Sequence, residues 1–349
     1  MSTNANKLLF HWSSLLMQGG LVFSPIIVNS WRNKLNHDFH LRKMISADLP
    51  NMPDENLLSL IEAELFEKSE GRMYPFEKAD FGIKVQDDME SATYGFFNCY
   101  NSALFRFSTR LALADVETIR RHYPNFLRLF KENFASKWVK DLKSVWDNIR
   151  SAKGVRDLLT IFREKDLHHL HVDTSLLSDE DLQKVLLSPN AKKFVITREI
   201  LLADSFFHAM PALYSFMSFG IGWILLSFLK LKMNERLAVA ISFLFAVCFF
   251  IFLDRIDRIN EVVKFDKECL ELDDVHLSGA KEYLQSSIEL GKLLNRLTNG
   301  KARFDANGNY ERHMITYTDR LKIVEDAEKL LLNDKKRMEK QKMRKLFSD

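Results

Sequence analysis

The chain has 349 residues, with 50 Lys and Arg against 47 Asp and Glu, so its formal net charge is only +3. This balance gives no indication of nucleic-acid binding by bulk charge, and a nucleic acid is not expected as a partner. The three cysteines, Cys99, Cys248 and Cys269, are widely spaced, which argues against a disulfide scaffold and against a paired-cysteine metal or redox motif.

The N-terminal segment, residues 1–28, contains an uncharged stretch from residue 8 to residue 28. This stretch could be a third membrane span, a secretory signal or part of an organellar import sequence. No acidic residue precedes Asp38, whereas Lys7 and Arg32 are basic, and acid-poor basic leaders are typical of mitochondrial import. Because IIVNSW is a poor signal-cleavage site, we favour a retained membrane segment.

A soluble α+β region is predicted over residues 29–204. Residues 54–69 have helical periodicity. Within residues 80–106, the segments FGIKV, ATYGFFNCY and ALFRF have the pattern of short strands separated by turns. Residues 108–165 return to a helical pattern, and residues 177–205 predict two helices separated by a Ser-Pro-Asn break.

One stretch of this region, DLHHLHVDT, places His168, His169 and His171 close to Asp166 and Asp173. A zinc site on a helix needs histidines at i and i+4 with a further ligand, and this spacing is different. No metal and no cofactor are therefore expected here. The chain also contains no Gly-rich phosphate loop, nucleophile elbow or carboxylate dyad, so no catalytic residue is assigned and an enzyme is not expected.

Two apolar runs indicate the fold class. Residues 205–229 contain no Asp, Glu, Lys or Arg, and as a helix they would extend about 37 Å, enough to cross a hydrocarbon core about 30 Å thick. Residues 237–253 form a second uncharged run, at the short end of what can span. A pair of buried core helices is the alternative, but such helices usually keep a polar stripe that these runs lack.

Between the two runs lies KLKMNER, residues 230–236, with three basic groups and one acid. Burying a charge in hydrocarbon costs about 2.5–3.5 kcal/mol, so this segment must lie in water or among lipid headgroups. The sequence therefore predicts a transmembrane helical hairpin over residues 205–253, in contact with membrane lipids, within a mainly α membrane protein. The positive-inside rule does not orient the hairpin clearly.

Small residues recur every four positions within the predicted hairpin. Ala238, Ser242 and Ala246 share one face of the second span, and Ser218 and Gly222 share one face of the first. Such faces let helices approach closely in lipid. They could pack the hairpin on itself or receive a partner helix, and these five residues are the predicted positions for a partner-helix contact.

The C-terminal region, residues 254–349, is predicted to be helical with a basic end. Asp305, Asn307 and Asn309 resemble the first ligands of a calcium loop, but the Gly and Glu required later in such a loop are absent. An Asn-Gly turn explains this stretch better. The basic end could contact anionic lipid or RNA, or simply form a solvated helix end.

Two stretches resemble the transmembrane protein 177 family of the mitochondrial inner membrane. They are AKKFVITREILLADSFFHAMPAL, residues 191–213, and a longer one from SGAKEYLQ to DRLKIV, residues 278–324; residues 73–102 are a weaker match, and residues 105–170 look like an addition. The resemblance implies a multi-pass, non-enzymatic inner-membrane protein. It implies a role in stabilising newly made cytochrome c oxidase subunit 2, together with that subunit's membrane chaperone, during oxidase assembly.

The order of the predicted elements suggests an alternative of another class. Strands, a helix, a transmembrane hairpin and a further helix is also the order in membrane-embedded zinc peptidases, where the helix before the hairpin carries His-Glu-x-x-His. Here this helix reads FVITREILLADS, with Glu199 but without the histidines. The alternative is thus a catalytically dead relative of these peptidases that acts by binding protein, with an active protease a more remote version.

Overall fold

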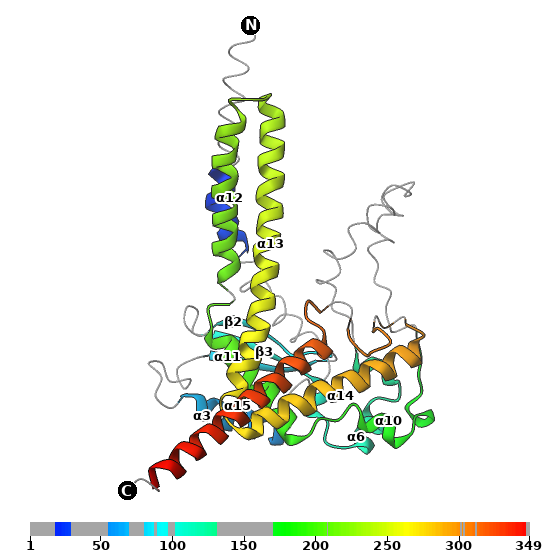
Figure 1. Cartoon of the computed structure of the whole chain (residues 1–349). Helices are drawn as coiled ribbons and strands as arrows, with labels where there is room; N and C mark the ends of the chain where they lie inside the picture. Colours follow the sequence, from blue (N-terminus) through cyan, green and yellow to red (C-terminus); the bar gives the residue numbers. More distant parts are fainter. Residues whose placement is uncertain are drawn as a thin grey trace.

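The computed structural model is mainly helical, with one small sheet (Figure 1). Two long helices, α12 (Met210–Leu229) and α13 (Glu235–Leu270), project together from a domain formed by most of the other elements. The structure describes residues 18–28, 55–69, 80–86, 89–96, 102–130, 170–207, 209–300, 302, 304–310 and 313–346.

The two projecting helices are in contact with each other, and the predicted pair of apolar helices with a charged turn is confirmed. The first helix begins later than the apolar run, because Ser205 ends the preceding helix by donating hydrogen bonds from its N–H and its hydroxyl to the Leu202 carbonyl. Pro211 then lies in the first turn of α12, where its missing N–H costs no hydrogen bond.

Helix α13 continues well past the end of its apolar run at residue 253. It has 36 residues, which corresponds to about 54 Å. Its first half is apolar, and its second half carries charges and ends in the domain at the base of the hairpin, among Phe265, Cys269 and Leu270, all buried. One unbroken helix therefore belongs both to the hairpin and to the domain core.

The domain at the base of the hairpin contains the three short strands that the sequence predicts. Strand β3 (Ser102–Ser108) lies in the middle, with β1 (Asp80–Gln86) parallel on one side and β2 (Ala92–Phe96) antiparallel on the other. The helices and 3₁₀ turns of the domain are α3 (Glu55–Ser69), α5 (Thr109–Ala112), α6 (Val116–His122), η3 (Phe126–Leu129), η6 (Thr174–Leu176), α10 (Asp179–Gln183), α11 (Pro189–Asp204), α14 (Asp274–Thr298) and α15 (Tyr317–Leu346).

Several of these helices match the sequence predictions. The predicted break before α11 is confirmed: the Ser188 hydroxyl accepts a hydrogen bond from the Ala191 N–H at 3.1 Å, and Pro189 occupies the first turn. Long helices after the hairpin are also confirmed. The helical pattern of residues 108–165 corresponds only to short helices up to residue 130, and the rest of that range lies outside the described residues.

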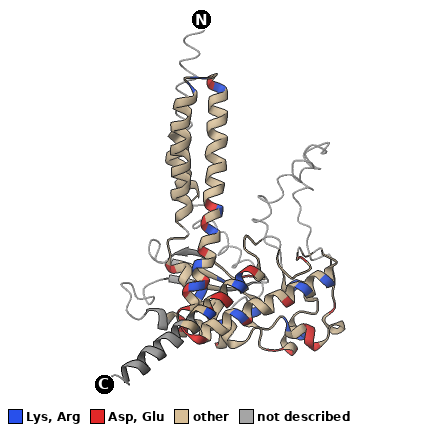
Figure 2. Cartoon of the chain, in the orientation of Figure 1, with Lys and Arg blue, Asp and Glu red and all other residues tan. Residues whose placement is uncertain are grey.

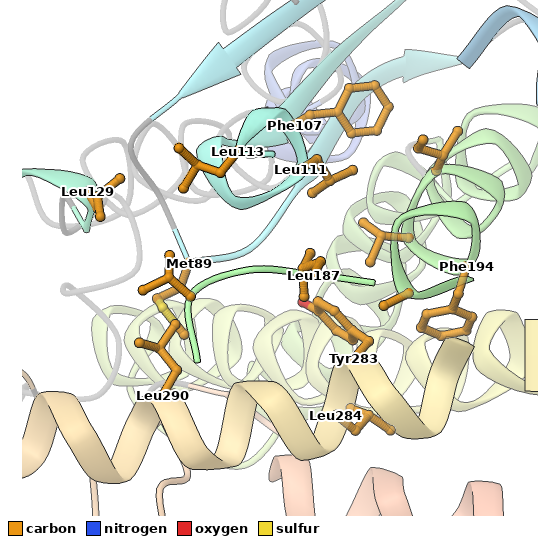
Figure 3. Close-up of a cluster of buried hydrophobic side chains, with 14 of the residues drawn as sticks. Met89, Phe107, Leu111, Leu113, Leu129, Leu187, Phe194, Tyr283, Leu284 and Leu290 are labelled. Atoms are coloured by element: carbon orange, nitrogen blue, oxygen red, sulfur yellow. The ribbon is translucent and has the colours of Figure 1, made fainter. Parts of the chain in front are cut away.

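A single apolar core joins α3, the sheet, α11, α14 and α15. Figure 3 shows Phe107, Phe194 and Tyr283 among its side chains, and the rings of Phe194 and Tyr283 lie 6.0 Å apart. Because α13 ends in this core, the packing that stabilises the domain also fixes the base of the hairpin.

Helix α14 passes very close to the start of α11 at Gly279. A Cβ atom at this position would lie 2.2 Å from the carbonyl oxygen of Asn190 and 2.6 Å from its carbonyl carbon. Backbone atoms cannot swing aside as the end of a side chain can, so the close approach of the two helices requires glycine here.

We expect Gly279→Ala to lower the free energy of unfolding by about 1–3 kcal/mol, because the added methyl group must push the two helices apart. Denaturant titration of the detergent-solubilised chain measures this. Glu289→Ala is the control on the same helix: its carboxylate is half exposed and pairs with Lys292 at the surface, so a change within about 0.5 kcal/mol is expected. Equal effects of the two substitutions would contradict the close contact.

Candidate functional site

The five predicted partner-helix residues all lie on buried faces of the hairpin. Ser218, Ala238, Ser242 and Ala246 have no exposed surface, and Gly222 is buried as well. Since α12 and α13 contact each other, these small residues line the inside of the hairpin and let the two helices approach closely. A contact with a helix of another protein through the same residues stays a prediction.

The outer faces of the two helices are apolar and exposed. Both helices are long and apolar enough to cross a membrane, and only 22% and 17% of their apolar windows are buried. A core helix of a soluble protein would be mostly covered, so the alternative of two core helices is disfavoured. The exposed side chains include Phe216, Ile224 and Phe228 of α12 and Phe243, Leu244 and Phe252 of α13.

Charged residues gather at the two ends of the hairpin and are absent from its middle (Figure 2). At the tip, Lys230 lies 3.5 Å from Glu235, while Lys232 and Arg236 are exposed. At the base, Arg258 donates to Asp254 at 2.9 Å, one helical turn earlier in α13. The distribution is the one expected of a hairpin whose middle lies in hydrocarbon and whose ends lie in water or headgroups.

Below the hairpin, a buried ionic network surrounds Asp266 of α13. The Asp266 carboxylate accepts two hydrogen bonds from Arg320 of α15, at 2.7 and 3.0 Å. Its Oδ1 atom also lies 3.0 Å from Nε of Arg198 on α11. All three side chains are at most 10% exposed, so α11, α13 and α15 are joined by charges that have little access to water.

The network extends from Arg198 to the sheet. Arg198 lies 3.4 Å from Oε1 of Glu199, and Thr93 of β2 donates to Oε2 of Glu199 at 2.7 Å. Burial raises the pKa of Glu199, against the opposing effects of Arg198 and Thr93. Glu199 is only 2% exposed, so this carboxylate has almost no contact with solvent or with an incoming substrate.

The surroundings of Glu199 bear directly on the peptidase alternative. In a His-Glu-x-x-His helix the two histidines would occupy positions 198 and 202, and here these are arginine and leucine. A guanidinium cannot bind a metal cation, and Arg198 is instead paired with two carboxylates. These residues do not fit a catalytic zinc ion.

A second buried cluster resembles a catalytic triad in its distances. Thr197 Oγ1 lies 3.0 Å from Nε2 of His276, and Nδ1 of His276 lies 2.7 Å from Asp273. The Thr197 hydroxyl, however, donates to Glu64 at 2.5 Å and is fully buried in the middle of α11. A nucleophile must reach its substrate, so this cluster joins α3, α11 and α14 and is not suited to acyl transfer.

The structure describes the histidine stretch only in part, and it describes residues 305–309 of the calcium-like stretch in full. Asp166, His168 and His169 lie outside the described residues, and Asp173 caps η6 by accepting from the Ser175 N–H at 2.8 Å. Asp305 accepts from the Asn309 N–H at 2.7 Å in a tight turn, which confirms the turn interpretation. In the described ranges, no three His, Cys, Asp or Glu side chains are grouped as metal ligands.

Sequence reasoning found the hairpin but missed the network around Asp266. The sequence held one indication of this network. Asp266 lies on the apolar face of an amphipathic segment, between Phe265 and Cys269, which are both buried. Its partners lie on other helices, one of them 54 residues further along the chain.

We expect Asp266→Ala to lower the free energy of unfolding by about 3–5 kcal/mol, because it leaves two buried guanidinium groups without their shared carboxylate. Thermal or denaturant unfolding in detergent measures the loss. Asp326→Ala removes a carboxylate that pairs with Lys329 at an exposed site of α15, and no measurable change is expected from this control. A small effect of Asp266→Ala would show that the network contributes little to stability.

Acid should weaken the cluster around Glu64. Burial by itself would raise the pKa of Glu64, but the nearby His276 imidazole, 3.6 Å away, the hydrogen bond from Thr197 and the charge of Lys193 hold this pKa below its ordinary value of 4.5. A depressed pKa stabilises the fold above that value, and the stabilisation is lost as the pH falls below it.

The difference in unfolding free energy between the parent chain and Glu64→Gln should therefore be largest near neutral pH and shrink below about pH 4.5. Denaturant titrations at pH 7 and pH 4 measure it. Glu62→Gln, an exposed position on the same helix, should show no such trend. A constant difference for Glu64→Gln at both pH values would contradict the assignment.

Comparison of the chain with protein-family models, with curated proteins and with solved structures found no match.

Proposed function

We propose that this chain is a non-enzymatic factor of the mitochondrial inner membrane that stabilises newly made cytochrome c oxidase subunit 2, together with that subunit's membrane chaperone, during oxidase assembly. The organelle and the partners come from the resemblance of residues 191–213 and 278–324 to the transmembrane protein 177 family. The observation that carries the binding role is the continuous helix α13, which joins an apolar hairpin to a well-packed soluble domain.

The hairpin and the domain have complementary features for such a role. The outer faces of α12 and α13 offer apolar surface at the depth of a client's membrane helices. The domain below is fixed to the hairpin by Asp266 and its two arginines, so it is held next to any client segment that leaves the membrane. Two buried carboxylates, Glu199 and Glu64, form ion pairs and hydrogen bonds within the fold.

The second candidate is the dead relative of membrane zinc peptidases. The observation that favours it is the position of Glu199, which lies on the helix directly before the hairpin and next to the sheet, as the general base does in those enzymes. This candidate also acts by binding protein. It differs from the first in what it binds, which would be a protein segment of the kind that those peptidases cleave. An active enzyme would need ligands at positions 198 and 202.

Affinity purification of the crosslinked full chain from detergent-treated mitochondria tests the first candidate. Subunit 2 and its chaperone are expected to co-purify, and loss of the chain should lower the level of subunit 2. Normal subunit 2 levels without the chain, and purification without either partner, would overturn the proposal. Stoichiometric zinc in the purified protein, with a chelator-sensitive cleavage activity, would instead favour an active hydrolase.

A matched pair of hairpin variants tests whether the membrane part contributes to binding. Ser242→Phe places a bulky ring on the buried face of α13 and should reduce recovery of both partners several-fold, because it forces the hairpin apart. Ser227→Phe places the same ring at an exposed position of α12 and should leave recovery near that of the parent. Equal recovery with both variants would show that binding does not depend on the hairpin.

A further inference from the structure

A third apolar helix, Gln18–Val28, lies beside α12 (Figure 1). Its contact with α12 is built from two glycines that face large side chains in a reciprocal way. A Cβ atom at Gly20 would lie 2.6 Å from the ring of Phe219, and a Cβ atom at Gly220 would lie 3.6 Å from Leu21. Each helix thus presents a large side chain to a glycine of the other, an arrangement that brings helix axes close together in lipid.

Phe219 cannot easily move away from this contact. Its ring also packs edge-on against Phe243 of α13, with the ring centroids 6.0 Å apart. The ring therefore has Gly20 of the N-terminal helix on one side and α13 on the other. Through this one side chain, the N-terminal helix is connected to both helices of the hairpin.

The other face of the N-terminal helix is apolar and uncovered. Val22, Phe23, Ile26 and Ile27 are between 55% and 62% exposed. Four large apolar side chains on one side of a helix, at the depth of the middle of α12, require a lipid environment as the outer faces of the hairpin do. The inner face fits the hairpin and the outer face fits hydrocarbon.

We propose that this helix is the docked third member of the membrane unit, and that it is part of a full pass which places the N-terminal end of the chain on the same side as the hairpin tip. The inference rests on the hairpin crossing the membrane. The described helix extends only about 16 Å, but residues 8–28 are uncharged throughout and as a helix would extend about 31 Å, enough for a pass.

The side of the membrane on which the N-terminal end lies follows from how many times the chain crosses. The soluble domain, which includes α3 and α11, lies at the base of the hairpin. Helix α12 leaves that base, α13 returns to it, and the described elements between the N-terminal helix and α12, from α3 to α11, belong to the domain. A single pass through residues 8–28 must then start on the side of the tip, residues 230–236.

Intact-mass analysis of double-cysteine variants tests the sidedness. The chain, with its three native cysteines replaced, is reconstituted into sealed vesicles and treated with a membrane-impermeant maleimide. Cysteines at Thr3 and Lys232 should both react or both stay unlabelled in each molecule. Cysteines at Thr3 and Leu176, an exposed residue of the domain that is 83% accessible, should give one label in every molecule.

A third pair separates this inference from the proposed function. Lys232→Cys with Leu176→Cys should give one label, since the tip and the domain lie on opposite sides. If this pair gives one label but Thr3→Cys with Leu176→Cys gives none or two, the third pass is overturned and the hairpin stands. If Lys232→Cys with Leu176→Cys gives none or two, the hairpin itself does not cross the membrane.

The docking contact has its own matched test. Cysteines at Leu21 and Gly220 should form an oxidative crosslink in the membrane, and Gly20→Leu should reduce its yield several-fold by colliding with Phe219. Gly19→Leu is the control, because among the described residues a Cβ atom there meets only Phe23 of its own helix, at 3.9 Å. Adding Phe219→Ala to Gly20→Leu should restore the crosslink. Equal yields for Gly19→Leu and Gly20→Leu would overturn docking through Gly20.

Discussion

The carboxylate of Asp266 joins the apolar helical hairpin of this protein to the domain at its base. It lies near the end of the helix that descends from the hairpin, and it is shared by an arginine from α11 and another from α15. A carboxylate with two guanidinium groups is favourable in a buried site only when its hydrogen bonds are satisfied, and Arg320 provides two of them. The helices before, within and after the hairpin are thereby fixed to one another at one point.

Charge is distributed differently in the two parts of the molecule. In the hairpin, the middle of each helix has no charged residues. The two helices are held together there by close packing of small residues such as Gly222 and Ala238. In the domain, charges are buried and paired, and the apolar core around Phe194 and Tyr283 surrounds them. Helix α13 belongs to both parts and changes character after residue 253, where its apolar run ends.

The hairpin could be predicted because its signal is local. An uncharged run such as residues 237–253 needs no knowledge of distant residues to indicate its environment. The small residues at positions 218, 222, 238, 242 and 246 were recognised from their spacing, although spacing alone left open whether they face each other or another protein. The strands and the start of α11 at Ser188 were also predicted, since turn and cap residues act within a few positions.

The charged network could not be predicted in the same way. Asp266 gives only a weak local signal. In the sequence, Arg198 and Arg320 look like ordinary surface residues of helices, and only tertiary contacts place them beside Asp266 in the interior. The same holds for Gly20, whose role depends on an aromatic ring about two hundred residues away in the chain. The start of α12 differed from the prediction because Ser205 ends one helix and Pro211 lies in the first turn of the next. Both residues lie within one uncharged run, so hydropathy alone does not show this boundary.

The unbroken length of α13 has a mechanical consequence. A helix of 36 residues that is held at both ends by packing behaves as a stiff lever. Membranes differ in thickness by a few ångströms, and a spanning helix adjusts to such differences mainly by tilting. If the hairpin crosses a membrane as proposed, a tilt within the bilayer would swing the domain by the same angle, because one unbroken helix belongs to both.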